Sequence, residues 1–230
     1  MKCTAIVLSA GRGKRMNSQI QKQYMDLNGY PVIYYSLKCF QDCPWIDDII
    51  LVSGPEDIEY CQKEIVDRYG FDKVSGIAAG GKERYHSVYH GLQLCWDTDY
   101  VFIHDGARPM IDQEILQRGL ECVKKWDACA AGMPSKDTVK IVDEERLVVS
   151  TPDRSGVWNI QTPQVFSYVL AMRSYEMAMP HENEKITDDA MVVEKFGDHP
   201  VALYEGSYKN IKITTPEDIK IAEMFIKEKC

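Results

Sequence analysis

The chain has 230 residues, enough for one large α/β domain or two small ones, and 45% of them are hydrophobic and 27% charged, as in a soluble globular protein. No apolar run approaches the roughly 20 residues that a membrane-spanning helix needs, so we expect no membrane partner. The net charge of −8 argues against non-specific binding to nucleic acid. An anionic ligand would therefore have to be held by local cations.

The N-terminal apolar run leads into a glycine loop and not into a small-residue cleavage site, so we interpret it as a first strand and expect a cytoplasmic protein. The eight cysteines form no C-x-x-C pair and have no histidine at metal-ligand spacing. We therefore expect small core side chains, with neither a disulfide nor a structural zinc site. The cysteines are Cys3, Cys39, Cys43, Cys61, Cys95, Cys122, Cys129 and Cys230.

Runs rich in Val and Ile alternate along the chain with stretches whose apolar residues recur three or four positions apart. The runs predict strands at 4–9, 49–53, 100–104 and 128–133, and the stretches predict helices at 31–41, 55–69, 83–95 and 112–126. This alternation predicts a Rossmann-like three-layer α/β sandwich with a mostly parallel twisted sheet. Such sheets bind ligands at the carboxyl ends of their strands.

The segment 136–158 breaks the alternation, because it has two β-like pieces around the acidic turn "DEER". It predicts a hairpin or a protruding β-arm. Its apolar side chains need a surface to cover them, and the pattern favours a second copy of the chain and its own domain about equally. We expect one domain over residues 1–230, with the arm as its dimerisation subregion.

The loop "LSAGRGKRM" (8–16) directly follows the first predicted strand. Its glycines can expose backbone N–H groups to an anion, with Arg12, Lys14, Arg15 and then Lys22 around them. Four cations in eleven residues suit a triphosphate better than a monophosphate. A dinucleotide fingerprint would need a glycine in place of Met16, and the spacing of a P-loop is also absent. A solvated basic loop is the alternative interpretation.

Six blocks resemble the sugar-nucleotide cytidylyltransferases, and most closely the 2-C-methyl-D-erythritol 4-phosphate cytidylyltransferase family. They occur in order along nearly the whole chain: the opening loop with Lys22, "AGGKERYHSV" (79–88), "HDGARP" (104–109), "DRSGVWNIQTPQVF" (153–166), "ITDDA" (186–190) and "NIKITTPED" (210–218).

The resemblance implies a single nucleotidyltransferase domain that transfers CMP from CTP to 2-C-methyl-D-erythritol 4-phosphate and releases pyrophosphate, with Mg²⁺ as cofactor and a homodimer as the active form. Ribitol-5-phosphate cytidylyltransferases share the framework, although "TPDRSGVW" and "ITDDA" are more similar to the erythritol family. Two alternatives belong to other classes: a dinucleotide-dependent reductase on a Rossmann sheet, and a silent nucleotide-binding module.

For the nucleotide, the resemblance implies contacts from Ala10, Gly11, Gly13, Lys14, Gly80, Gly81 and Ser87. The last two would distinguish cytosine from uracil, because a backbone carbonyl and a hydroxyl can complement the amino donor and the acceptors of cytosine. The chain departs from the family at Ser9 and Gly106, which replace alanines, and at His86, where an acidic or small residue is common. We expect His86 to be a tolerated neighbour and not a catalyst.

Asp105 follows the predicted strand 100–104 and should face the nucleotide cleft. A carboxylate repels a triphosphate unless a divalent cation lies between them, so Asp105 is a predicted Mg²⁺ ligand. A helix N-cap is the alternative role. For the polyol phosphate the resemblance implies Asp105, Arg108, Thr162, Thr187 and Lys212, with Thr138 and Arg154 supplied by the partner subunit. Thr162 and Thr187 could instead be caps.

The catalytic groups implied are Arg15, Lys22 and Lys212. The phosphate of the acceptor is already ionised, so no general base is needed, and catalysis would be positioning plus charge stabilisation. Arg15 and Lys22 would steady the triphosphate, and Lys212 would lie between the two phosphates. Lys212 alternates with Ile211 and Ile213, which predicts a strand that points the lysine away from the core.

Overall fold

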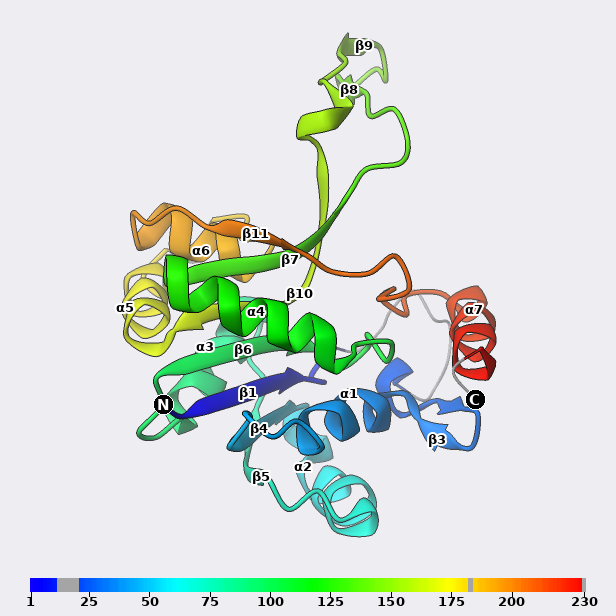
Figure 1. Cartoon of the computed structure of the whole chain (residues 1–230), viewed down its shortest axis with the longest axis vertical. Helices are drawn as coiled ribbons and strands as arrows, with labels where there is room; N and C mark the ends of the chain where they lie inside the picture. Colours follow the sequence, from blue (N-terminus) through cyan, green and yellow to red (C-terminus); the bar gives the residue numbers. More distant parts are fainter. Residues whose placement is uncertain (12–20, 182–183, 229–230) are drawn as a thin grey trace.

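The computed structural model describes residues 1–11, 21–181 and 184–228, and its centre is a seven-stranded sheet in the order β11-β7-β10-β6-β1-β4-β5 (Figure 1). Among the described strands of this sheet, β10 alone runs antiparallel to its neighbours. The predicted mostly parallel α/β sandwich is therefore confirmed. The strands are β1 (Cys3–Leu8), β4 (Asp48–Ser53), β5 (Val74–Ala79), β6 (Tyr100–Asp105), β7 (Ala128–Pro134), β10 (Trp158–Ser167) and β11 (Ala202–Glu205).

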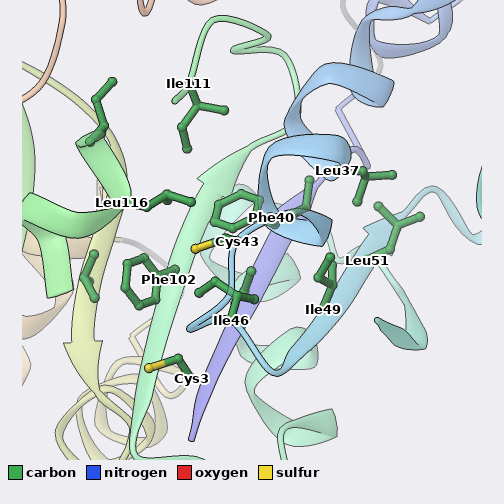
Figure 2. Packing of buried hydrophobic residues seen from close by; sticks show 14 of the residues in the cluster. Cys3, Leu37, Phe40, Cys43, Ile46, Ile49, Leu51, Phe102, Ile111 and Leu116 are labelled. Carbon is green, nitrogen blue, oxygen red and sulfur yellow. The ribbon is translucent and has the colours of Figure 1, made fainter. Parts of the chain in front are cut away.

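Helices cover both faces of the sheet, as its continuous apolar strands require. On one face lie α1 (Val32–Gln41), α4 (Gln113–Trp126) and the π-helical η4 (Cys61–Asp67), which continues α2 (Ile58–Tyr60). Figure 2 shows Phe40 of α1 packing on this side near Phe102 of β6. On the other face lie α3 (Arg84–Leu94), α5 (Tyr168–Ala178) and α6 (Asp189–Phe196). The last helix, α7 (Pro216–Lys227), closes a small separate core around Leu27 and Ile213.

The order of the strands creates a switch point beside β1. The chain runs from β1 to β4 and β5 on one side of β1, and then returns to place β6 on its other side. Connections on the two sides of such a point diverge and leave a crevice at the carboxyl ends of the strands. The loops after β1, β4, β5 and β6 therefore gather at one edge of the sheet.

The segment between β7 and β10 is the predicted arm. It carries a small hairpin of β8 (Ile141–Val142) and β9 (Val148–Ser150), and it protrudes from the body of the protein (Figure 1). The tip presents five large apolar side chains that are 47% to 66% exposed: Ile141, Val142, Leu147, Val148 and Val149. In this single chain they have no core to enter, so they form an apolar surface at the end of the arm.

The strand predicted around Lys212 is wrong. Residues 211–214 belong to no helix or strand, and the segment instead crosses the carboxyl edge of the sheet. Its backbone is attached there by a 2.8 Å hydrogen bond from Ile213 N–H to the carbonyl oxygen of Ala107. One such bond holds a chain in place without building a ladder. Ile213 is buried, but Ile211 and Lys212 are both partly exposed, so the predicted strict alternation is also wrong, although Lys212 points away from the core as predicted.

The seven cysteines among the described residues are free thiols, and five of them are buried. Within the part of the chain that the structure covers, no helix is both long and apolar enough to cross a bilayer.

Candidate active site

A cavity of about 880 Å³ lies at the switch point, at the carboxyl ends of β1, β4, β5 and β6. The loops after these four strands supply most of its lining, together with Lys22, Gln23, Lys212 and Thr214. It brings together a large part of the predicted nucleotide and catalytic set, namely Ala10, Gly11, Lys22, Gly80, Gly81, Ser87, Asp105 and Lys212. Gly13, Lys14 and Arg15 lie outside the described residues.

Two glycines in the loop after β5 allow close packing, Gly80 against the loop after β1 and Gly81 against the start of α3. A Cβ atom at Gly80 would be 2.2 Å from Cβ of Ala10, and one at Gly81 would be 2.4 Å from Cβ of His86. Ser87 then fixes the loop, because its Oγ accepts a 3.0 Å hydrogen bond from Gly81 N–H and donates one of 3.2 Å to the Glu83 carbonyl. The result is a backbone-lined wall on which no larger side chain fits.

The start of α3 explains His86. Its Nδ1 accepts from Glu83 N–H at 3.2 Å, while the Glu83 side chain accepts from His86 N–H. This reciprocal pair is a capping box in which histidine replaces the usual Glu or Gln. In this structure His86 therefore acts on the helix end that follows the glycine loop.

The loop after β1 is braced from behind by Gln23. This side chain is buried and donates to the carbonyl oxygens of Ser9 and of Gly11, the latter at 3.0 Å. Lys22, one residue earlier, donates to the carbonyl oxygen of Ile213 at 2.9 Å. The same short segment 22–23 thus connects the glycine loop to the segment that carries Lys212.

Asp105 ends β6 and is surrounded by cations. Its Oδ2 lies 2.8 Å from Nζ of Lys212 and 3.8 Å from Nε of Arg108, and its Oδ1 lies 3.1 Å from Nε of Arg84. Burial alone would raise the pKa of Asp105, but Arg84, Lys212 and Arg108 hold it well below its usual value. The site therefore contains one ionised carboxylate that faces three basic side chains.

Thr162 lies behind Asp105 and is buried. Its hydroxyl accepts from Asp105 N–H at 3.1 Å and pairs with Nδ1 of His104 at 3.0 Å, while Nε2 of His104 contacts the Arg108 carbonyl at 3.2 Å. Burial lowers the pKa of His104 to about 4, so the ring is neutral and one of its nitrogens must accept. A carbonyl can only accept, so Nε2 donates to Arg108 and the Thr162 hydroxyl donates to Nδ1. In this conformation Thr162 holds Asp105 in place.

Arg108 is largely buried beside the same segment as Lys212. Its Nη1 donates to the carbonyl oxygen of Asn210 at 2.8 Å. Burial lowers the pKa of this guanidinium, against the opposing effect of Asp105, and it remains a cation at neutral pH. Three basic side chains therefore approach Asp105 from three separate segments.

Five of the predicted residues that the structure describes do not line the cavity within this chain. Arg108 and Thr162 lie next to Asp105, and the other three are Thr138, Arg154 and Thr187. Thr138 and Arg154 are exposed on the arm, where Arg154 donates to the carbonyl oxygen of Lys136 at 3.2 Å. Thr187 is exposed before α6, with its Oγ1 3.6 Å from Sδ of Met191. None of the three belongs to the cavity lining.

Sequence reasoning missed Arg84 and its partner Asp189. Both stand inside blocks that were singled out, "GGKERYHSV" and "ITDDA", but neither pattern indicates that they pair. In the structure Arg84 lines the cavity and Asp189 is buried behind it. The only indication in the sequence is that each is an ionisable residue within three positions of a predicted binding residue. Such residues are too common to identify a pair.

Comparison with known proteins gives consistent matches. The family model described as "IspD: 2-C-methyl-D-erythritol 4-phosphate cytidylyltransferase" matches residues 3–228. The 2-C-methyl-D-erythritol 4-phosphate cytidylyltransferase of Lachnospira eligens is 51% identical over 225 residues, which cover 97% of this chain and 99% of that protein. The protein of the same name from Lachnoclostridium phytofermentans is 48% identical over 227 residues, which cover 99% of this chain and 97% of that protein.

Solved structures are also similar. The crystal structure of 4-diphosphocytidyl-2C-methyl-D-erythritol synthase from Anaerococcus prevotii has a TM-score of 0.86 at 35% identity, covering 98% of this chain and 96% of that one. The crystal structure of 2-C-methyl-D-erythritol 4-phosphate cytidylyltransferase from Francisella tularensis has a TM-score of 0.81 at 30% identity. The match covers 97% of this chain and 99% of that one. The likeness therefore extends over nearly the whole chain.

The neutral His104 gives the fold a defined dependence on pH. Its pKa is about 4 in the folded protein, against roughly 6.5 when unfolded, so the unfolded chain binds the extra proton between these values. The contribution of His104 to the free energy of unfolding is fully present above its pKa in the unfolded chain, and it is lost as the pH falls toward 4. From pH 7 to pH 5 the wild type should lose about 2 kcal/mol more free energy of unfolding in urea than His104→Gln does.

The matched control is His199→Gln, because His199 is only partly buried and its described side-chain hydrogen bond is with the carbonyl oxygen of the adjacent Pro200. This variant should keep the pH dependence of the wild type. An equal slope for wild type and His104→Gln would contradict a neutral, buried His104.

Proposed function

This chain belongs to the 2-C-methyl-D-erythritol 4-phosphate cytidylyltransferase family, and on that premise we propose how its residues transfer CMP from CTP to 2-C-methyl-D-erythritol 4-phosphate. One observation carries the proposal. A backbone-lined loop that suits a pyrimidine and two lysines that suit phosphates meet in one cavity, over the carboxylate of Asp105. A reductase would need a dinucleotide fingerprint, which the glycine loop lacks.

The reaction is an in-line displacement at phosphorus. A phosphate oxygen of the acceptor attacks the α-phosphorus of CTP, the bond to the β-phosphate oxygen breaks, and pyrophosphate leaves. The products are 4-diphosphocytidyl-2-C-methyl-D-erythritol and pyrophosphate. Because the attacking phosphate is an anion, the protein has to align the two substrates and stabilise the developing charge.

The cytosine is proposed to bind at the wall formed by Gly80, Gly81 and Ser87. The close approach of this wall to Ala10 leaves backbone groups facing the cavity, and these can read the edge of a base without side-chain flexibility. The triphosphate would follow the loop after β1, through Gly11 and onward to Gly13, Lys14 and Arg15.

The transferred phosphate is proposed to lie between Lys22 and Lys212. Lys22 reaches the carbonyl of Ile213, the residue next to Lys212, so both ammonium groups come to the same part of the cavity. Lys212 is 37% exposed, and its partner in this structure is Asp105. A bound phosphate can therefore replace Asp105 as the partner of Lys212 after a small rotation of the lysine side chain.

The polyol phosphate is proposed to bind beyond Asp105. Asp105 accepts hydrogen bonds from its hydroxyl groups and Arg108 donates to it, while Thr187 is near the start of α6. Thr162 supports this end through the backbone of Asp105. Thr138 and Arg154 would come from the arm of the partner subunit.

The residues present fit a Mg²⁺ ion that is held mainly by substrate phosphates. Mg²⁺ commonly takes one or two carboxylates and completes its shell with phosphates and water. Asp105 is an ionised carboxylate on the cavity wall, and it would share its oxygens with Lys212 and Arg84. Within the described residues there is no cluster of three His, Cys, Asp or Glu that could form a cage of its own. When bound, the metal supplies positive charge for the triphosphate and the leaving group.

A homodimer through the arm is proposed from the five exposed apolar side chains at its tip. Covering them in a symmetric interface would give each copy a partner surface and build two identical sites. A cytoplasmic location is proposed likewise.

Lys22→Ala should lower kcat by on the order of 10²–10³, as loss of other preorganised electrostatic groups does. The measurement is release of pyrophosphate from CTP and the polyol phosphate. Lys63→Ala is the control, because Lys63 on η4 pairs with the exposed Glu59 on α2 and does not line the cavity. A loss of less than about tenfold would remove Lys22 from the catalytic groups.

Chelation with EDTA should abolish activity, and added Mg²⁺ should restore it. Asp105→Asn should raise the Mg²⁺ concentration for half-maximal activity by at least about tenfold. Asp112→Asn is the control, since Asp112 caps α4 and asparagine is an equally good cap. Full activity in chelator, or an unchanged Mg²⁺ requirement in Asp105→Asn, would contradict the metal assignment.

Mixing two inactive variants tests the arm. Lys22→Ala and Arg154→Ala are unfolded together and refolded. Random pairing makes about half of the dimers mixed. If Arg154 acts on the partner's site, each mixed dimer has one site with both defects and one intact site. Roughly a quarter of all sites should then recover activity.

The control mixture is Lys22→Ala with Lys212→Ala. Both lysines line the cavity of one chain, so every site keeps one defect and no activity should return. Failure of the first mixture to recover, with mixed dimers confirmed by mass, would place Arg154 at its own site.

A further inference from the structure

A buried bridge connects helix α5 to the cavity. The hydroxyl of Tyr175 donates to Oδ1 of Asp189, and both of these residues are fully buried. Asp189 in turn accepts two hydrogen bonds from Arg84, at 2.7 Å from Nη1 and 2.8 Å from Nη2. The Nε of Arg84 then donates to Oδ1 of Asp105 at 3.1 Å. The bridge therefore ends on the carboxylate that faces the cavity.

The geometry of this bridge fixes the orientation of Arg84. A guanidinium bound through both terminal nitrogens to one carboxylate is held in a plane, because the fork of donors matches the two oxygens. Its third nitrogen is then aimed in one direction, at Asp105. A lysine at this position would supply charge but could not aim a second bond in this way.

Asp189 has no competing task at the start of α6. The N-cap of that helix is Asp188, whose Oδ1 accepts from Met191 N–H at 3.0 Å. Gln164 ties the same turn to β10 through Asp188 Oδ2 at 2.9 Å and Ala190 N–H at 2.7 Å. The helix end is thus already capped and anchored, and the Asp189 side chain instead accepts hydrogen bonds from Arg84 and Tyr175.

Burying this ion pair is hard to explain by stability alone. Asp189 loses its hydration because it is fully buried, while the Arg84 side chain stays 28% exposed at the cavity, and well-packed apolar residues are often as stabilising as a buried pair. The cost is easier to explain when one end of the pair has a task at a binding site. Here that end is Arg84, which lines the cavity between the cytosine wall and Asp105.

We propose that Asp189 is a positioning residue of the transfer reaction, which through Arg84 holds Asp105 in the orientation that the polyol phosphate requires, with Tyr175 fixing Asp189 in turn. This inference rests on the proposed CMP transfer. Asp189 begins α6, two residues after Thr187, and Arg84 begins α3, three residues after Gly81. The bridge therefore joins the part of the site proposed for the acceptor to the part proposed for the nucleotide.

The test is steady-state kinetics of Asp189→Asn, with pyrophosphate release as the readout. Asparagine keeps the size of the side chain but cannot hold the guanidinium through two charged oxygens. We expect kcat to fall on the order of 30-fold, because small misplacements of a reacting group have effects of this size. The KM for the polyol phosphate should rise, and the KM for CTP should stay within about threefold, since the cytosine wall is fixed separately by Ser87.

Asp188→Asn is the matched control. It changes the neighbouring acid on the same helix turn, and asparagine can still cap α6. We expect a kcat within about twofold of the wild type, even where the melting temperature changes. Loss of kcat to the same extent in Asp188→Asn and Asp189→Asn would overturn the proposal and indicate a general effect of the α6 terminus.

Tyr175→Phe keeps the test decisive if Asp189→Asn does not fold, because it removes one hydroxyl and no charge. It should lower kcat by roughly three- to tenfold with the same KM pattern. The double variant Arg84→Gln/Asp189→Asn should be no slower than Arg84→Gln alone, since both act through one bridge. A wild-type kcat in Tyr175→Phe, or additive losses in the double variant, would overturn the positioning role. A wild type that releases no pyrophosphate would instead overturn the proposed reaction.

Discussion

The pairing of one buried carboxylate with three cations organises this site. Asp105 is held ionised by Arg84, Lys212 and Arg108, which come from the start of α3, from the segment 210–213 and from the loop after β6. A carboxylate that is largely removed from water needs such partners, because an unpaired buried charge is very costly. The requirement explains why a segment without secondary structure crosses the carboxyl edge of the sheet and stays in place there.

A second constraint is steric and acts on the nucleotide side. Gly80 packs so closely against Ala10 of the loop after β1, and Gly81 against His86 of α3, that neither position has room for a Cβ atom. Backbone groups then face the cavity on one side and ionised side chains face it on the other. This division suits a ligand with a flat polar base at one end and phosphates at the other, and it follows from the switch in strand order beside β1.

The arm differs from the body of the protein in how its apolar side chains are covered. Its side chains are exposed, and the apolar ones at its tip cannot contribute to a core within one chain. The body is stabilised by two apolar layers against the sheet, so the arm can vary without disturbing them. The described lining of the cavity comes from one chain, whereas Thr138 and Arg154 of the arm do not line it.

The sequence by itself determined those strands and helices that follow from the spacing of apolar residues along the chain. Runs rich in Val and Ile, and stretches with apolar residues three or four positions apart, predicted β1, β4, β6 and β7 with the helices between them. A strand covered on both faces needs a continuous apolar run, and a helix covered on one face needs an apolar stripe. The same patterns did not identify β5, where Gly76 interrupts the run, or β11, which lies at the sheet edge with Leu203 43% exposed. The position of Asp105 after a strand placed it at the cavity for the same local reason.

Tertiary structure alone decided which partners these residues have. Arg84 and Asp189 are 105 positions apart, and Thr162 and His104 are 58 apart, so no spacing in the chain could indicate that they bond. Lys212 points at Asp105 without the strand that its pattern predicted. The segment is held by the burial of Ile213 in a small core and by its hydrogen bond to Ala107, and not by a sheet. A hydrogen bond between distant residues depends on how whole elements pack, which is a property of the folded chain.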